Sequence, residues 1–303
     1  MLLRIAVLLT VFSQLTTLVP LVPGQQSKNE SAQVFAYDRS VAFDLKEESS
    51  KDQDGITIRD VNYAPYTPER GRVKAFLIKP AGKGPFAGVL FFHWLGEHKS
   101  DRSEYLDEAV ALAKQGTVSL LIQGYFPWAV APKDGATDRQ RVIDETIEVR
   151  RAVDLLLTQP GVDRKRIGYV GHDYGAMYGA NLAGVDKRVK TFIFMAPIGS
   201  FNYWSLAYWL KKQDAPFKEA YRQALRPVDP VTHISHAAPT TILFQFANQD
   251  EHIPKAEAMA LFDVASEPKE MKWYEAKHDL NIDAAQNDRR EWLTRHLSLK
   301  PRS

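Results

Sequence analysis

The chain has 303 residues, 45% of them hydrophobic, so it is long enough to bury one large core or two modest ones. Its 39 basic and 37 acidic residues leave a formal net charge of +2, and this balance gives no indication of a nucleic-acid partner or a polybasic membrane contact. Because there is no cysteine, disulfides, thiolate metal sites and a cysteine nucleophile are all excluded.

Residues 1–24 have the pattern of an export signal peptide. Arg4 supplies the positive start and residues 5–12 supply the apolar centre. An uncleaved membrane anchor is the alternative, but Ser, Gln and Thr residues over 13–17 interrupt the apolar run that a spanning helix needs. We therefore predict a secreted or periplasmic protein without stable membrane association, in which residues 25–303 form a single domain.

The folded domain begins with three segments typical of β-strands, at residues 40–45, 55–63 and 73–78. Polar stretches separate them and suggest antiparallel strands at one sheet edge. From residue 84 onward, strands and helices alternate. Strands are predicted at residues 87–92, 118–122, 167–170, 191–195, 240–246 and 271–274, and helices at 103–115, 139–157, 176–184, 256–264 and 284–297. This alternation predicts an α/β fold with a mostly parallel sheet, helices on both faces, and functional residues at the carboxyl ends of the strands.

Residues 200–229 depart from the alternation. The segment is rich in aromatic residues at helical spacing, which predicts a short helical lid over the strand ends. Tyr203, Trp204 and Tyr208 would then line a substrate pocket. The alternative is a pair of surface helices whose aromatic side chains pack on the core.

The segment Gly171-His-Asp-Tyr-Gly175 has the form of a nucleophile elbow, in which a reactive residue sits on a strained turn between a strand and a helix. The flanking glycines are required because a side chain there would collide with the neighbouring strand and helix. An apolar run precedes the motif, and a helix with small residues on one face follows it. The residue at the apex is Asp173, where serine or cysteine is more usual.

Two later segments supply partners for Asp173. Asp250 follows the strand predicted at 240–246, and His278 follows the strand predicted at 271–274. The order nucleophile, acid, histidine is the α/β-hydrolase order, and a carboxylate on one ring nitrogen would orient His278 as a base. Glu251 is the alternative acid, and Asp250 would then only cap a turn.

A site for a developing negative charge is also predicted. Trp94 and Leu95 follow the strand at 87–92, where such folds supply one backbone N–H of an oxyanion hole, and Tyr174 would supply the other. His93 and Trp128 are expected at the pocket wall, with His93 holding its loop. The other histidines are expected to be noncatalytic: His172 as a loop-packing residue, and His233, His236 and His252 as solvated or capping residues.

These motifs give the chain a resemblance to the α/β-hydrolase superfamily, over residues 41–299. Its layout looks most like the dienelactone-hydrolase-like branch, through the short insert and the segments around Asp250 and His278. The elbow itself is similar to those of epoxide hydrolases and haloalkane dehalogenases, which use an aspartate nucleophile. The resemblance implies lid tyrosines that protonate an opened epoxide, for which Tyr203, Tyr208 and Tyr221 are candidates.

The chemistry of an ionised aspartate favours attack on an sp³ carbon, because attack on an ester carbonyl would give a mixed anhydride, a poorer intermediate. The leading prediction is therefore a hydrolase of a small apolar epoxide or haloalkane, in which Asp173 forms a covalent ester and His278 with Asp250 activates water. The alternatives are a dienelactone-hydrolase-like or esterase-type hydrolase of carboxylic esters or lactones, and a noncatalytic binding descendant. No metal or organic cofactor is expected, because no ligand cluster or phosphate-binding loop is present.

Overall fold

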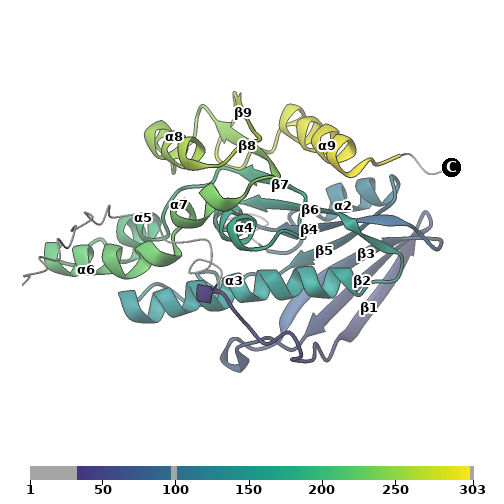
Figure 1. The fold of residues 1–303 in the computed structure, drawn as a ribbon, viewed down its shortest axis with the longest axis horizontal. Coiled ribbons are helices and arrows are strands. Elements are labelled where there is room, and N and C mark those ends of the chain that lie inside the picture. The colour runs from purple at the N-terminus through teal and green to yellow at the C-terminus, as the bar shows by residue number, and fades with distance from the viewer. Residues whose placement is uncertain (1–32, 97–100, 301–303) are drawn as a thin grey trace, which may run out of the picture.

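The computed structural model describes residues 33–96 and 101–300, so the predicted signal peptide over 1–24 lies outside the described residues. A twisted nine-stranded sheet runs through the molecule in the order β1-β2-β3-β5-β4-β6-β7-β8-β9 (Figure 1). The first three strands are antiparallel to their neighbours, and the strands from β5 to β9 are mutually parallel. The predicted mostly parallel sheet is confirmed, with its topological switch at β4.

The strands are β1 (Lys46–Gln53), β2 (Ile56–Tyr63), β3 (Val73–Pro80), β4 (Phe86–Phe92), β5 (Thr117–Ile122), β6 (Val162–His172), β7 (Thr191–Met195), β8 (Thr241–Ala247) and β9 (Lys269–Tyr274). Strands β4, β5 and β7 are buried along their whole length. Their continuous apolar sequences follow from helices covering both faces of a parallel sheet.

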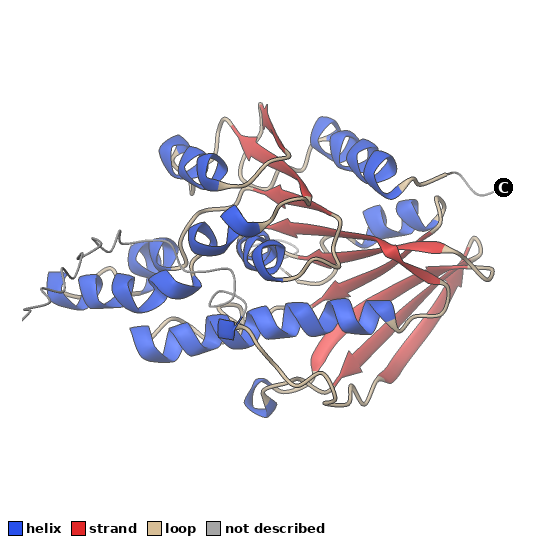
Figure 2. Ribbon diagram, in the orientation of Figure 1, coloured by secondary structure: helices blue, strands red, loops and turns tan. Residues whose placement is uncertain are grey.

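The helices that pack on the sheet are α2 (Leu106–Ala113), α3 (Gly135–Leu157), α4 (Tyr174–Val185), α8 (Lys255–Val264) and α9 (Asp283–Leu297). Helices α3 and α4 cover one face of the sheet, and α2 and α9 cover the other (Figures 1 and 2). The N-cap of α3 is Asp134, whose carboxylate accepts the backbone N–H of Thr137. This cap places the start of α3 four residues before the predicted one.

The first predicted strand, at residues 40–45, was wrong. The first strand of the sheet is instead β1, whose side chains are all exposed and whose sequence is almost entirely polar. An edge strand needs only backbone pairing on one side, so it shows no apolar alternation. Its one sequence signal is the Asp54-Gly55 turn, where both residues have positive φ, at 50° and 74°, as a tight hairpin requires.

The insert over 200–229 is helical, as predicted. It contains α5 (Asn202–Trp204), a π-helical turn η2 (Ser205–Trp209), α6 (Ala215–Leu225) and η3 (Arg226–Val228), and α7 (Pro230–His233) and η4 (Ile234–His236) lead back to β8. In Figure 1, α5 and α6 project from the same end of the molecule as the N-terminus of α3. Within the described ranges, no helix combines the length and apolar character needed to cross a bilayer.

Candidate active site

The predicted elbow is present at the junction of β6 and α4. Asp173 has φ 55° and ψ −119°, a left-handed conformation that side-chain-bearing residues rarely adopt. A Cβ on Gly175 would collide with the backbone oxygen of Phe92, and one on Gly171 would collide with the backbone of Gly175. The two glycines therefore let β6, α4 and β4 approach closely, which pushes the Asp173 side chain out at the carboxyl end of the sheet.

Asp173, His278 and Asp250 come together from three separate loops. His278 Nδ1 lies 2.8 Å from Asp250 Oδ2, and His278 Nε2 lies 3.8 Å from Asp173 Oδ1. The first distance is a hydrogen bond and the second is too long for one. Asp250 Oδ1 also accepts the backbone N–H groups of His252 and Ile253, so its carboxylate is fixed. Asp250 is thus the acid that contacts the imidazole, and the alternative acid, Glu251, is exposed.

The two carboxylates set the protonation of His278. Burial alone would lower the pKa of its imidazole, but Asp173 and Asp250 outweigh that effect and raise the pKa to about 9. Burial alone would raise the pKa of Asp250. The hydrogen bond and charge of His278, together with two backbone N–H groups, outweigh burial and lower the pKa below its usual value. At neutral pH the resting site is therefore an imidazolium between two carboxylates.

Of the two loop amides predicted for the oxyanion hole, that of Leu95 faces Asp173 and that of Trp94 does not. The backbone N–H of Leu95 donates to Asp173 Oδ2 at 2.9 Å. The backbone N–H of Trp94 donates instead to Glu104 Oε2 at 2.8 Å and points away from Asp173. Tyr174 begins α4, so its backbone N–H lies at a helix N-terminus directly after the apex residue.

His93, predicted at the pocket wall, is buried and contacts two loops. Its Nδ1 donates to the carbonyl of Trp94 at 2.9 Å, and its Nε2 accepts the backbone N–H of Gly124 at 3.0 Å. Trp128 joins the same contact by donating its indole N–H to the carbonyl of Trp94 at 2.9 Å. Its ring lies 5.9 Å from that of Tyr174. The predicted loop-holding role of His93 therefore matches its contacts.

Two of the three aromatic residues predicted to line the lid contact the loop after β8, which carries Asp250. Trp204 is buried, with its ring 6.2 Å from that of His278 and its indole N–H donated to the carbonyl of His252. The hydroxyl of Tyr208, which is 51% exposed, lies 2.9 Å from His252 Nδ1. Tyr203 is half-buried against the core. The lid therefore lies over the imidazole.

Tyr221, a candidate lid tyrosine, and His233 are both buried. The hydroxyl of Tyr221 donates to Asp138 on α3, so it ties the lid to that helix and does not face Asp173. His233, predicted to be solvated or capping, is fully buried and packs edge-on against Phe35, which precedes β1. His172 is buried as expected, but it contacts both Glu104 and the catalytic-histidine loop. Glu104 was not predicted, because a single acidic residue ahead of a helix carries no motif.

At the base of the lid, Asp229 is a buried carboxyl that accepts the backbone N–H of Phe201 at 2.8 Å. Burial raises its pKa to about 8. Because this exceeds the value of about 3.9 in an unfolded chain, Asp229 stabilises the fold fully only below about pH 4, and that contribution is lost as the pH rises through 8. An Asp229→Asn variant should therefore gain stability relative to the wild type, by roughly 2–5 kcal/mol at about pH 9 and much less at about pH 5.

Urea unfolding at both pH values measures this difference, with the exposed Asp263→Asn on α8 as the control. Asparagine keeps the oxygen that accepts the Phe201 N–H, so the comparison isolates the charge. A stability difference that does not change with pH would show that Asp229 ionises normally in the folded protein.

A strand, an elbow with an aspartate at its apex, and the acid and histidine on later strand-end loops together define the α/β-hydrolase arrangement. A cavity of about 520 Å³ opens on the far side of Trp94, between α2 and α9, and Asp173 and His278 do not line it. Across the described part of the chain, no three His, Asp or Glu side chains are grouped so as to hold a metal ion.

Solved structures share this fold. An acetyl xylan esterase from a Paenibacillus species matches with a TM-score of 0.74 at 17% identity, over 92% of this chain and 97% of that one. Acetyl xylan esterase 1 from a Thermoanaerobacterium species gives 0.70 at 15% identity, over 88% and 92%. The glucuronoyl esterase of Solibacter usitatus gives 0.61 at 14% identity, over 88% and 91%. No protein-family model and no curated protein matches the sequence. The likeness shows the fold: the chain has the α/β-hydrolase fold.

Proposed function

We propose that this chain is a hydrolase in which Asp173 forms a covalent ester with the substrate, and His278 with Asp250 activates the water that cleaves it. The observation that carries the proposal is the position of the Asp173 carboxylate. One oxygen is held by the Leu95 N–H at 2.9 Å, and the other faces the imidazole of His278 at 3.8 Å. A carboxylate placed in this way already has a carbonyl oxygen in an anion site and a free oxygen for attack.

In the first step, Asp173 Oδ1 would attack an sp³ carbon of the substrate. The new bond is the C–O bond of an alkyl ester, and the electron pair of the broken bond leaves on a halide or on the oxygen of an opened epoxide. That oxygen needs a proton. Tyr208 is the lid tyrosine that would supply it, since its hydroxyl lies 2.9 Å from His252 on the loop that carries Asp250.

In the second step, His278 would take a proton from water while the water oxygen attacks Cγ of Asp173. The negative charge then develops on Oδ2, where the Leu95 N–H already points. Ester formation removes the charge of Asp173, one of the two carboxylates that hold the pKa of His278 near 9. The pKa of the imidazole therefore falls when the ester forms, and His278 becomes a base at the stage that needs one.

The surroundings of Asp173 favour a small apolar substrate. Trp94, Trp128 and Trp204 lie around the elbow and the imidazole, as their ring contacts with His278 and Tyr174 indicate. Such aromatic walls suit an epoxide or a haloalkane. The predicted export signal supports a site of action outside the cytoplasm.

Hydrolysis of a carboxylic ester or lactone is the second candidate. Its support is that the structures named above are described as esterases, at identities that carry only the fold. In that reaction Asp173 would act as the base for water. His278 is not expected to act as the general base in the first step, as the histidine of a serine hydrolase does. An imidazole with a pKa of about 9 is protonated at neutral pH and cannot accept another proton.

The test is a trapping experiment on His278→Gln, which keeps the nucleophile and removes the base. After incubation with panels of epoxides, haloalkanes and activated esters, intact mass is expected to show one substrate-derived adduct, mapped to Asp173, with an epoxide or haloalkane. His296→Gln is the matched control, because its side chain contacts Thr241 at the opposite end of β8. No adduct, together with ester turnover that survives Asp173→Asn, would contradict the proposal. Absence of both adducts and turnover would indicate a binding protein.

A further inference from the structure

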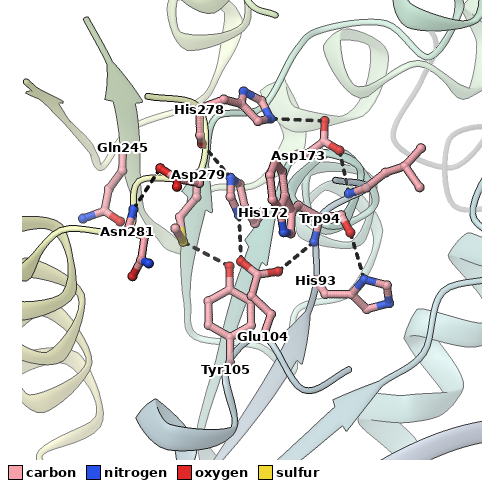
Figure 3. Close-up of polar contacts among 12 residues, drawn as sticks. His93, Trp94, Glu104, Tyr105, His172, Asp173, Gln245, His278, Asp279 and Asn281 are labelled. Carbon is pink, nitrogen blue, oxygen red and sulfur yellow. Dashed lines mark hydrogen bonds and ion pairs between the residues drawn. The ribbon is translucent and has the colours of Figure 1, made fainter. Parts of the chain in front are cut away.

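Glu104 connects the oxyanion loop to the end of the elbow strand. One carboxylate oxygen accepts the backbone N–H of Trp94 at 2.8 Å, and the other lies 2.7 Å from His172 Nδ1. The second ring nitrogen of His172 lies 2.9 Å from the carbonyl oxygen of His278. Figure 3 shows this chain of contacts running from Trp94 through Glu104 and His172 to the catalytic-histidine loop. We call Glu104 and His172 the bracket.

The contacts of the bracket determine where its protons lie. A carbonyl oxygen can only accept, so His172 Nε2 must carry a hydrogen that it donates to His278. A second hydrogen lies in the contact between Nδ1 and the Glu104 carboxyl oxygen. The other Glu104 oxygen accepts the Trp94 N–H, so each polar atom of the bracket has a partner.

The ring contacts hold His172 in place. The indole of Trp94 stacks on its imidazole with centroids 5.2 Å apart and planes at 8°. The imidazole of His278 lies 5.4 Å from that of His172, and Asp173 follows His172 in the chain. The carboxyl of Glu104 also borders the cavity between α2 and α9.

The bracket holds the backbone next to both groups that act on Asp173, the Leu95 N–H and the imidazole of His278. By holding the Trp94 N–H, Glu104 fixes the peptide that precedes the Leu95 N–H, which donates to Asp173 Oδ2. By holding the carbonyl of His278, His172 fixes the backbone that carries the imidazole 3.8 Å from Asp173 Oδ1. We propose that Glu104 and His172 are positioning residues, which keep the anion site and the base at a fixed spacing on either side of the Asp173 carboxylate. This role rests on the proposed function.

The variants that test this role are Glu104→Gln and His172→Gln, with Asp107→Asn as a matched control. Glutamine at 104 can accept one of the two hydrogen bonds, but its amide nitrogen must face the other donor. Asp107 is exposed on α2, and Asp107→Asn removes one carboxyl group, as Glu104→Gln does. Both bracket variants should lower kcat by about 10- to 100-fold with little change in KM, since a misplacement of about 1 Å is enough for that loss. The control should match the wild type.

NMR of nitrogen-labelled histidine supplies readouts that do not need a substrate. In the wild type Nε2 of His172 should carry the proton that it donates to the carbonyl of His278, and the Nδ1 signal should shift in Glu104→Gln as its carboxyl partner is replaced. The pKa of His278, about 9 in the folded protein, should fall in both variants as the imidazole leaves its place beside Asp173. Thermal unfolding establishes that each variant folds. If His172→Gln does not fold, the test of the positioning role uses Glu104→Gln alone.

The outcomes separate this role from the proposed function. A His172 Nε2 without a proton in the wild type, or a wild-type pKa of His278 in folded bracket variants, would overturn the positioning role. Unchanged kcat in both variants would do the same. If instead His278→Gln shows no trapped ester while both NMR readouts change as expected in the bracket variants, the proposed chemistry fails and the bracket still positions His278.

Discussion

Asp173→Asn is expected to lower turnover of the trapped substrate by about 10³- to 10⁴-fold while the protein remains folded. The amide is neutral and a poor nucleophile, so the first covalent bond cannot form at a useful rate. Its side-chain oxygen can still accept the Leu95 N–H, which preserves the geometry of the elbow. Steady-state kinetics measures the loss, and thermal unfolding checks the fold.

Asp263→Asn, exposed on α8, serves as the matched control and should retain full activity. A different pattern would point to a different role. If Asp173→Asn keeps activity within about tenfold of the wild type, the carboxylate is not the attacking group, because removal of a nucleophile costs far more than this.

The second large effect is on the titration of His278. In the wild type its pKa is raised to about 9, and in Asp173→Asn it should fall by roughly one to two pH units, because one of the two neighbouring negative charges is gone. Asp250→Asn should also lower it, since the hydrogen bond to Nδ1 then no longer involves a carboxylate. NMR titration of the His278 ring protons measures both values directly.

The raised pKa of His278 also makes the stability of the fold depend on pH. The folded pKa of about 9 lies above the value of about 6.5 in an unfolded chain, so the pairing stabilises the fold fully below about pH 6.5 and is lost as the pH rises through 9. The wild type should therefore lose roughly 2–3 kcal/mol between these limits from this group, and Asp173→Asn should lose less. Equal losses in the two proteins would show that Asp173 does not hold the proton on His278.

Features that depend on order along the chain were predictable from the sequence. Asp173 could be placed because an apolar strand, two glycines at fixed spacing and a small-residue helix occur only in that order at an elbow. Asp250 and His278 could be placed because parallel strands end at the same edge of a sheet. Each required only a local pattern and the topology.

Features that depend on tertiary contact were not predictable. Glu104 and His172 are 68 positions apart, and nothing in either segment indicates that they form a pair. The Trp94 amide was assigned to the anion site because of its place after β4, but Glu104 draws it away. The polar strand β1 was missed because an edge strand buries no face, and its pairing with β2 is made by the backbone.

The covalent ester on Asp173 is tested most directly by a single turnover in water labelled with heavy oxygen. If water attacks Cγ of Asp173, the label enters the carboxylate, and the product alcohol keeps the oxygen that Asp173 donated. Peptide mass analysis of the segment around the elbow should then show one heavy oxygen on Asp173. Label in the product and none on Asp173 would contradict the covalent route, because it would mean that water attacks the substrate itself.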